Sequence, residues 1–493
     1  MKFLQAYFRN ALIASVGFFA SAILGVRYLR DAWLFAPINV DAGCYLAIAQ
    51  RLAEGWIPYR QIHFGYTPLG LLLFAQAKLL FSGVAESYLV YLGVVLFCEL
   101  ATCVVIGALC MRITENRAVA AFAGSLFLLG CALHEGWALI LEPFVTLFST
   151  LSVLLFVLDP GSIRRLFFAG VCGGLAFLTK QYGLFGLCAL AGAIALTPGF
   201  SFSELTAKAR RIAIVGSGAA FSVTVFAAYY GLRYGITPAQ LLADAWVSGY
   251  LKQPSPMDWY RAYVFTLNPF LLLLPILLCF RAYRSDSTFL VLSLSFVLYS
   301  LPCTIRNFAH YCILFIPYAC ALGAYLVDRF ARSQSFSVRC LSTLVLLSMA
   351  PVIAKTVAAP RWERAPSERE VQYTLASSVE GVWPHDTPVL IFGEPWLQYV
   401  ANFYPGYSPK GTYGFLSNYS PEDLHEMLEK STFVLVDNQS KYYFTPERTR
   451  LEEVYGDFFT LLRSLGYCRE TIRGERYEFW SKSCANNRES SKT

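Results

Sequence analysis

Five ionisable side chains stand at the edges of very apolar segments. The acids are Asp41, in "NVDAGCYLAIAQRLAEGW", and Glu142, in "LILEPFVTLF"; the cations are Lys180, in "FLTKQYGLF", and Arg306 with His310, in "TIRNFAHYCILF". An ionisable group at membrane depth costs roughly 2.5–3.5 kcal/mol on insertion scales, so each one suggests a function. Cations bind and stabilise a phosphate leaving group, and a carboxylate can take the proton from an attacking hydroxyl.

Each of these residues also has a simpler explanation. Asp41 opens a short helical pattern and could act only as a helix cap, and Glu142 could be a helix-start acid before Pro143. Lys180 could extend its side chain to the membrane surface. Arg306 could be an ordinary water-exposed residue, and His310 could be only an interface histidine. The joint placement of these groups, rather than any single residue, therefore carries the functional argument.

The composition indicates a polytopic membrane protein. Of 493 residues 56% are hydrophobic and only 15% are charged, with a mean hydropathy of +0.47. Apolar runs recur from Ala11 to about Thr356, and several approach the ~18–20 residues of a helical crossing. We expect about eleven crossings, near 11–29, 86–111, 118–135, 143–158, 166–179, 183–198, 212–231, 264–280, 288–302, 311–327 and 340–357.

The distribution of basic residues predicts an N-in, C-out topology. Lys and Arg concentrate in alternate loops, as the positive-inside bias requires, and these loops include Lys2, Arg112, Arg164, Lys208, Arg281 and Arg329. The net charge of +7 therefore does not indicate nucleic-acid binding, because no basic run with interleaved aromatics exists. This topology puts all five candidate side chains on the outer face.

One apolar run does not fit as a crossing. The run 67–83 carries Gln76 and Lys78 and would break the charge alternation, so we expect an interfacial or re-entrant helix. Residues 30–85 then form one large outer loop, in which the helix that opens at Asp41 lies in the membrane interface. The transmembrane domain is predicted to span residues 1–358.

The tail, 359–493, is predicted to be a small extracytoplasmic α/β domain. Short β-type runs lie at 388–392, 432–436 and 477–481, and "SPEDLHEMLEKS" reads as a helix with Ser420 as its cap. The predicted fold class is an all-α polytopic membrane domain followed by this α/β domain. Cys468 and Cys484 flank a predicted hairpin and would pair only in an oxidising compartment.

The sequence lacks the motifs of several common chemistries. It has no P-loop, no GxGxxG after a strand, no HExxH and no GxSxG, so nucleotide-driven and zinc-dependent reactions have no support. The 14 cysteines show no CxxC or Cys/His metal spacing. We expect no cofactor and no metal ligands; a divalent metal would fit the chemistry but nothing in the sequence supports one.

The chain resembles the polytopic GT-C glycosyltransferases over nearly its whole length. It is most similar to the branch of protein O-mannosyltransferases, lipid A aminoarabinose transferases and rhizobial core galacturonosyltransferases. The motifs are short, and they specify a class of enzyme rather than a substrate. They are Asp41 with the helix after it, Gly55, Pro58-Tyr59-Arg60, Pro68, Glu142, "LTKQ" at 178–181, "HY" at 310–311 and Pro317.

The resemblance implies a membrane glycosyltransferase, hexosyl or pentosyl, that moves a sugar from a polyprenyl-phosphate donor to a lipid, glycan or protein acceptor. The enzyme would lie among the lipids of the plasma (inner) membrane as a multi-pass protein, with its site on the extracytoplasmic side. Asp41 would be the catalytic base and Glu142 a second catalytic acid. Lys180, Arg306 and His310 would bind the donor phosphate. The residues expected to line the substrate are Tyr59, Arg60, His63, Tyr66 and Gln181.

Two departures from the family pattern bear on mechanism. Many relatives carry a second acid beside the first, whereas Asp41 is followed by Ala42, and many carry a lysine where Tyr66 stands. Two alternatives stay open: a flippase or transporter of a lipid-linked saccharide, and a polysaccharide polymerase. Transporters tend to show paired repeats and polar groups at the midplane, and neither is evident here.

Overall fold

The computed structural model describes most of the chain, including the greater part of the predicted membrane domain and the core of the tail. The described residues are 38, 40–59, 67, 69–80, 84–134, 136, 138–240, 285–305, 309–332, 368–379, 387–392, 395–400, 404–405, 421–437, 458–470 and 477–482. Three of the predicted crossings, 11–29, 264–280 and 340–357, lie outside these residues, as does the predicted domain boundary at 358.

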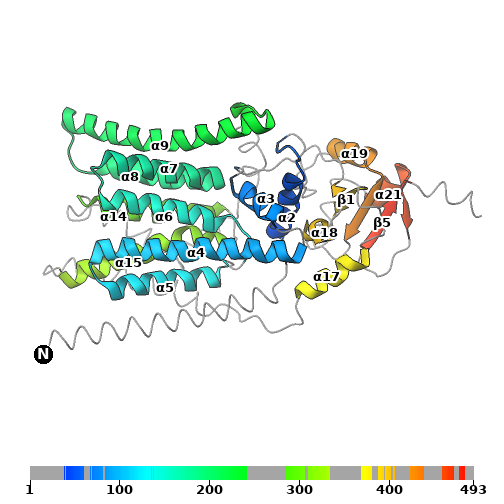
Figure 1. The fold of residues 1–493 in the computed structure, drawn as a ribbon, viewed down its shortest axis with the longest axis horizontal. Coiled ribbons are helices and arrows are strands. Elements are labelled where there is room, and N and C mark those ends of the chain that lie inside the picture. Colours follow the sequence, from blue (N-terminus) through cyan, green and yellow to red (C-terminus); the bar gives the residue numbers. More distant parts are fainter. Residues whose placement is uncertain are drawn as a thin grey trace, which may run out of the picture.

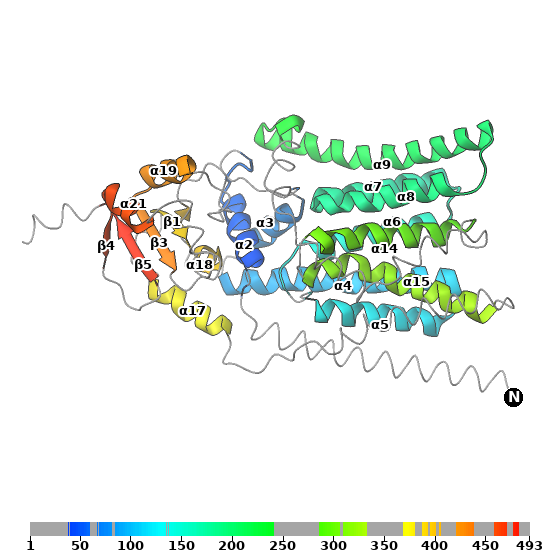
Figure 2. The ribbon, with the colours of Figure 1, turned by 180° about the vertical axis from the view of Figure 1, so that it is seen from behind.

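A bundle of long helices forms one end of the molecule (Figures 1 and 2). Eight of the predicted crossings coincide with its helices, so the prediction of a mainly helical domain is confirmed. The helices are α4 (Val84–Thr114), α5 (Arg117–Leu133), α6 (Glu142–Leu158), α7 (Ile163–Thr179), α8 (Leu184–Leu196), α9 (Phe202–Tyr234), α14 (Ser287–Ile305) and α15 (Cys312–Arg332).

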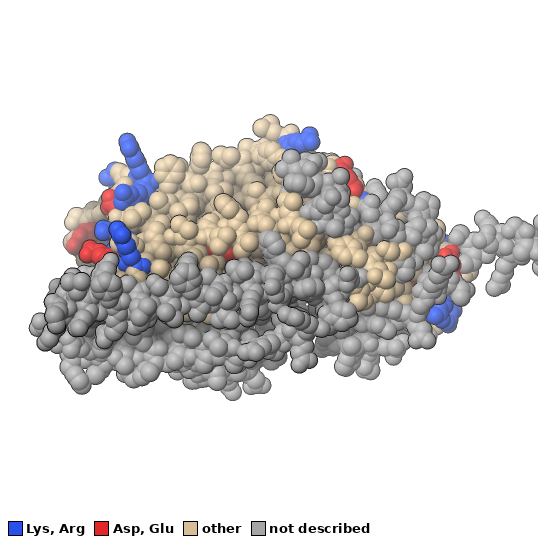
Figure 3. All heavy atoms as spheres, turned by 60° about the horizontal axis from the view of Figure 1, so that its bottom comes forward, with Lys and Arg blue, Asp and Glu red and all other residues tan. Residues whose placement is uncertain are grey.

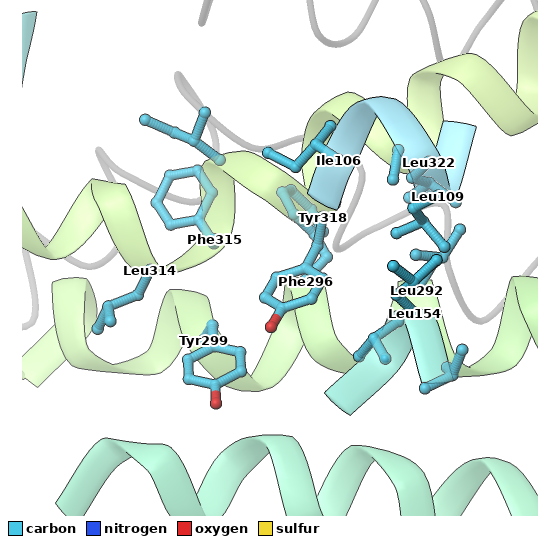
Figure 4. Close-up of a cluster of buried hydrophobic side chains, with 14 of the residues drawn as sticks. Ile106, Leu109, Leu154, Leu292, Phe296, Tyr299, Leu314, Phe315, Tyr318 and Leu322 are labelled. Atoms are coloured by element: carbon cyan, nitrogen blue, oxygen red, sulfur yellow. The ribbon is translucent and has the colours of Figure 1, made fainter. Parts of the chain in front are cut away.

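Three helices in the described part of the chain are long and apolar enough to cross a membrane: Tyr88–Thr114, Phe202–Tyr234 and Cys312–Arg329. Most of the charged side chains visible in Figure 3 lie towards the two ends of the long axis, with a belt of other residues between them. Inside the bundle, α4, α6, α14 and α15 share an apolar core with buried aromatic rings (Figure 4), among them Phe296, Tyr299 and Tyr318. These features fit an integral membrane domain.

Small residues let α7 and α9 pack closely. A Cβ on Gly170 would collide with the backbone of Val215, and one on Gly174 would collide with the hydroxyl of Ser222. A Cβ on Gly218 of α9 would likewise collide with the carbonyl oxygen of Phe167 on α7. Without a hydrophobic driving force between helices in lipid, close backbone approach of this kind is a main source of helix association.

Helix α9 begins about ten residues earlier than predicted, so Lys208 lies inside a helix rather than in a loop. Ser201 and Glu204 form a capping box at its start, a signal that the sequence already carried in "SFSE". The Lys208 ammonium donates hydrogen bonds to three carbonyls at the end of α8, including that of Gly199 at 2.8 Å. These bonds satisfy helix-end carbonyls that would otherwise lack partners.

Two short helices lie between the bundle and the C-terminal sheet (Figure 2). They are α2 (Val40–Ala53) and α3 (Leu69–Leu80), where the sequence predicted a short helix and an interfacial helix. Gly55, with φ +93°, follows the end of α2. Protein covers α2 on nearly all sides, so that residues 42–52 are buried, including Gln50 and Arg51. The location of this helix in the membrane interface stays a prediction.

The tail contains a five-stranded mixed sheet in the order β2-β1-β3-β5-β4. The predicted strands appear as β1 (Pro388–Phe392), β3 (Phe433–Asp437) and β5 (Tyr477–Ser481), and the predicted helix as α19 (Pro421–Lys430). Strands β1 and β3 are parallel, and β5 is antiparallel to β3 and β4. Strand β4 (Cys468–Glu470) pairs with β5 where the sequence predicted a hairpin. Elements that were not predicted are α17 (Glu368–Val379), α18 (Pro395–Val400), β2 (Tyr404–Pro405) and α21 (Phe458–Ser464).

The two sides of the sheet have different partners. One set of apolar side chains packs with α19 and α21 into a core of the domain itself, which includes Leu424, Leu462 and Trp480. The other set, with Leu435 and Phe479, joins the core that contains α2, α3 and the first turns of α4 and α6. The tail is therefore packed directly onto the first outer loop.

Candidate functional site

Asp41 lies in the first turn of α2. It is therefore a helical residue and not the N-cap residue that precedes the helix. Its carboxylate oxygen Oδ2 is 3.9 Å from Nε2 of His310, and its side chain is 32% exposed. A helix N-terminus stabilises a carboxylate, because the aligned peptide dipoles leave partial positive charge there. Asp41 is thus an ionisable acid that a ligand can reach.

Glu142 opens α6, where Pro143 fits the first helical turn because that position needs no N–H donor. Its carboxylate is fully buried, and Oε1 accepts a hydrogen bond from the Lys180 ammonium at 2.5 Å. Oε2 is also buried and has no hydrogen-bond partner within the described residues. This arrangement is a charge-assisted buried pair, which holds both groups firmly in place.

Lys180 caps the C-terminal end of α7 in an extended conformation, φ −158° and ψ 144°. A short 3₁₀ helix, η1 (Gln181–Gly183), follows at once, and a Cβ on Gly183 would collide with the α7 backbone at Ala176. This tight turn aims the lysine at Glu142. The rings of Tyr182 and Tyr311 lie 5.6 Å and 5.1 Å from the ammonium, within the range of cation–π attraction.

His310 lies in a second 3₁₀ helix, η2 (Ala309–Tyr311), immediately before α15. Its Nε2 is 3.9 Å from Asp41 and 4.0 Å from Oε1 of Glu142, so the imidazole lies between the two carboxylates. Only 5% of the His310 side chain is exposed. Four separate elements therefore bring two acids, a lysine and a histidine together at the end of the bundle that faces the tail.

Of the other predicted site residues, Gln181 and Tyr59 lie in the described part of the chain, and the others do not. Gln181 is half-buried in η1, next to Lys180. Tyr59 is buried and has φ +61°. Positive φ is uncommon for a residue with a Cβ. The residues that lie outside the described part of the chain are Arg60, His63, Tyr66 and Arg306.

Two contacts that the sequence did not predict hold the first outer loop against the site. Thr67 donates a hydrogen bond from Oγ1 to the carbonyl of Phe177, near the end of α7, at 2.7 Å. Gly70 approaches the side chain of Leu141, the residue before Glu142, so closely that a Cβ would collide with it. The only signal for these contacts was the small size of both residues. Among the described residues, no group of three His, Cys, Asp or Glu is arranged to hold a metal.

Comparison with solved structures identifies the fold. The chain is similar to ArnT from Cupriavidus metallidurans in the apo state, with 14% identity, a TM-score of 0.57, and coverage of 98% of this chain and 99% of ArnT. The same enzyme bound to undecaprenyl phosphate gives a TM-score of 0.55 at 14% identity, covering 98% of each chain. No family model and no curated protein sequence matches the chain.

A second similar structure is the archaeal oligosaccharyltransferase AglB from Archaeoglobus fulgidus, in complex with an inhibitory peptide and a dolichol-phosphate. Its TM-score is 0.55 at 12% identity, with 96% of this chain and 74% of AglB covered. Both neighbours are GT-C glycosyltransferases. The chain therefore has the GT-C fold, which confirms the resemblance drawn from its motifs; at this level of identity the likeness establishes the fold and not the reaction.

Proposed function

We propose that the protein is a membrane glycosyltransferase that takes a sugar from a polyprenyl-phosphate carrier. The observation that carries the proposal is the meeting of Asp41, Glu142, Lys180 and His310, from four different elements, in a fold shared with enzymes solved with lipid phosphates. The acceptor is a lipid, glycan or protein, and the transferred sugar is a hexose or a pentose.

In the proposed reaction the acceptor hydroxyl attacks the anomeric carbon of the donor sugar. The bond from this carbon to the phosphate oxygen breaks as the bond to the acceptor oxygen forms, and polyprenyl phosphate leaves. Asp41 takes the hydroxyl proton, because it is the accessible carboxylate of the two acids. Negative charge develops on the phosphate, and fixed cations nearby stabilise that charge.

We assign different roles to the remaining groups. His310 and Arg306 are the phosphate-binding cations of the proposal. Lys180 is buried against Glu142, so it adds its charge to the site from behind this carboxylate. Glu142 is the second acid, and its pairing with Lys180 makes it a fixed part of the wall rather than a proton acceptor. No metal is required by this scheme.

We also propose the finer topology. The protein would cross the membrane about eleven times, with an N-in, C-out arrangement in the plasma (inner) membrane. The exposed basic side chains of Arg112, Arg117, Arg164 and Arg165 lie at the ends of α4, α5 and α7 that are remote from the tail, which supports a cytoplasmic location for that end. The site and the tail would then face the extracytoplasmic side.

The test is sugar transfer by the purified protein from synthetic undecaprenyl-phosphate sugars, with released undecaprenyl phosphate and product measured by mass spectrometry. Asp41→Asn keeps the size of the side chain but cannot accept a proton at working pH. We expect it to lower turnover roughly 10²–10⁴-fold, the usual scale of general base catalysis.

A matched control is Glu204→Gln, which also converts a first-turn acid to its amide. Gln can replace Glu in a capping box, and Glu204 lies at the opposite end of the bundle, so turnover should be unchanged. Wild-type turnover in Asp41→Asn would remove Asp41 as the base. Flipping of the lipid-linked sugar in proteoliposomes without any transfer would favour the transporter instead.

A further inference from the structure

The four site residues differ in what holds them. Glu142, Lys180 and His310 lie at the ends of bundle helices or in the turns that join them. Asp41 lies on α2, outside the bundle. The apolar side chains of α2 belong to a core that is shared with the tail. The distance between Asp41 and His310 therefore depends on how α2 is fixed.

The tail is hydrogen-bonded to the main chain just before Asp41. The amide side chain of Gln372, on α17, makes two buried hydrogen bonds to the backbone of Ile38. The N–H of Ile38 donates to Oε1 at 2.7 Å, and Nε2 of Gln372 donates to the carbonyl of Ile38 at 3.0 Å. This pairing fixes the main chain three residues before the carboxylate, and Ile38 and Gln372 are only 1% and 8% exposed.

The tail also packs closely against α2 just after Asp41. A Cβ on Gly43 would lie 2.6 Å from Cα of Trp396, at the start of α18, and would collide with the backbone nitrogen as well. Trp396 and Leu397 are buried in the same core as Tyr45 and Leu46 of α2. Only glycine permits this backbone approach, two residues beyond the carboxylate.

We propose that the C-terminal domain positions the catalytic base, with Gln372 as a positioning residue that acts through the Ile38 backbone. The proposal rests on the proposed function, because it requires Asp41 to be the base. Helix α3 also packs on α2 and is tied to the bundle, so it sets the distance of the loop from the membrane domain. The tail sets the direction of the first turn of α2 and therefore the place of Asp41.

The experiment compares Gln372→Leu, which keeps the bulk and removes both hydrogen bonds, with Lys430→Ala. Lys430 lies in the same domain, at the end of α19, and forms an exposed ion pair with Glu426. Small displacements of a reacting group cost up to about 100-fold in rate, so Gln372→Leu should lower kcat by roughly 10- to 100-fold while the donor KM changes little. Lys430→Ala should retain wild-type kcat.

Two further measurements separate positioning from general destabilisation. In an Asp41→Asn background, Gln372→Leu should cause almost no additional loss, because the group it positions is gone. Hydrogen exchange of the peptide that covers 38–53 should accelerate in Gln372→Leu and not in Lys430→Ala, and this readout does not depend on activity. Gly43→Ala should reproduce both effects.

The outcomes are distinct. A folded Gln372→Leu protein with wild-type kcat, unchanged exchange at 38–53, or losses that multiply with those of Asp41→Asn would each overturn the positioning role. Absence of sugar transfer by the wild type, or full turnover in Asp41→Asn alone, would instead overturn the proposed function. Accelerated exchange at 38–53 would in that case still show that Gln372 fixes the start of α2.

Discussion

The contribution of the buried Glu142–Lys180 pair to stability can be predicted from its geometry. The ammonium and carboxylate are 2.5 Å apart, and their side chains are 2% and 0% exposed. Removing one partner from such a pair leaves a buried charge without compensation, which typically costs about 3–5 kcal/mol. We therefore expect Glu142→Gln and Lys180→Met each to lower the free energy of unfolding by that amount.

The double variant should be more stable than either single variant. Replacing both charges together leaves no uncompensated charge, and such replacements of buried pairs are often close to neutral. We expect Glu142→Gln with Lys180→Met to lie within about 2 kcal/mol of the wild type, a strong positive coupling in a double-mutant cycle.

The assay is equilibrium unfolding in mixed micelles, titrating a denaturing detergent and following intrinsic fluorescence. Asp41→Asn is the control, because the Asp41 side chain is 32% exposed and lies 3.9 Å from Nε2 of His310. Its loss should therefore cost less than the loss of a fully buried partner at 2.5 Å. Single variants as stable as the wild type, or a double variant that loses the sum of the two single losses, would refute the reasoning about this pair.

Three further outcomes are expected. Gly174→Leu should destabilise the α7–α9 contact by at least about 1–3 kcal/mol, whereas Gly216→Leu should not, since a Cβ there meets nothing within 4 Å; unfolding midpoints would show the difference. Tyr299→Phe removes a hydroxyl that bonds to Ser149 at 2.5 Å and to a main-chain N–H, and should cost about 1–3 kcal/mol with activity retained in the folded fraction. A reporter active only in the cytoplasm should be silent when fused after Thr493, and a strong signal would contradict the C-out topology.

Periodicity and composition predicted the regular elements well. The strands β1 and β5 differ from their expected ranges by no residue, because short apolar runs bounded by polar residues leave little choice of register. The start of α9 was misplaced because Arg and Lys were interpreted as loop residues. Its capping box outweighed that pattern, and the helix continued through Lys208.

The grouping of the site residues was predicted from charges elsewhere in the chain. The predicted sidedness of the basic loops put Asp41, Glu142, Lys180 and His310 on one face, and the structure brings these four residues together. The pairing inside the group was not predictable. It depends on the rotation of each helix and on the turn at Gly183, neither of which hydropathy contains.

The burial of α2 was also beyond the sequence argument. Its apolar face, with Tyr45 and Ile48, was evident, but the partner of its remaining surface depends on how a domain more than 300 residues later in the chain is docked. Gly43 was the available clue, since a glycine inside a helix costs stability unless close packing requires it. A small residue flanking a candidate catalytic acid can thus indicate where another domain approaches.

The order of the strands has a consequence for crowding at the membrane surface. Counted over the described residues, the outermost strands β2 and β4 have two and three residues, whereas the inner strands β1, β3 and β5 have five each. Short edges offer few unpaired N–H and C=O groups to a neighbouring chain. Copies of this protein share a thin layer above one membrane, where edge-to-edge strand pairing would be favoured by confinement. Limiting the sheet's edges in this way lets the tails remain separate while the helices beneath them diffuse and collide.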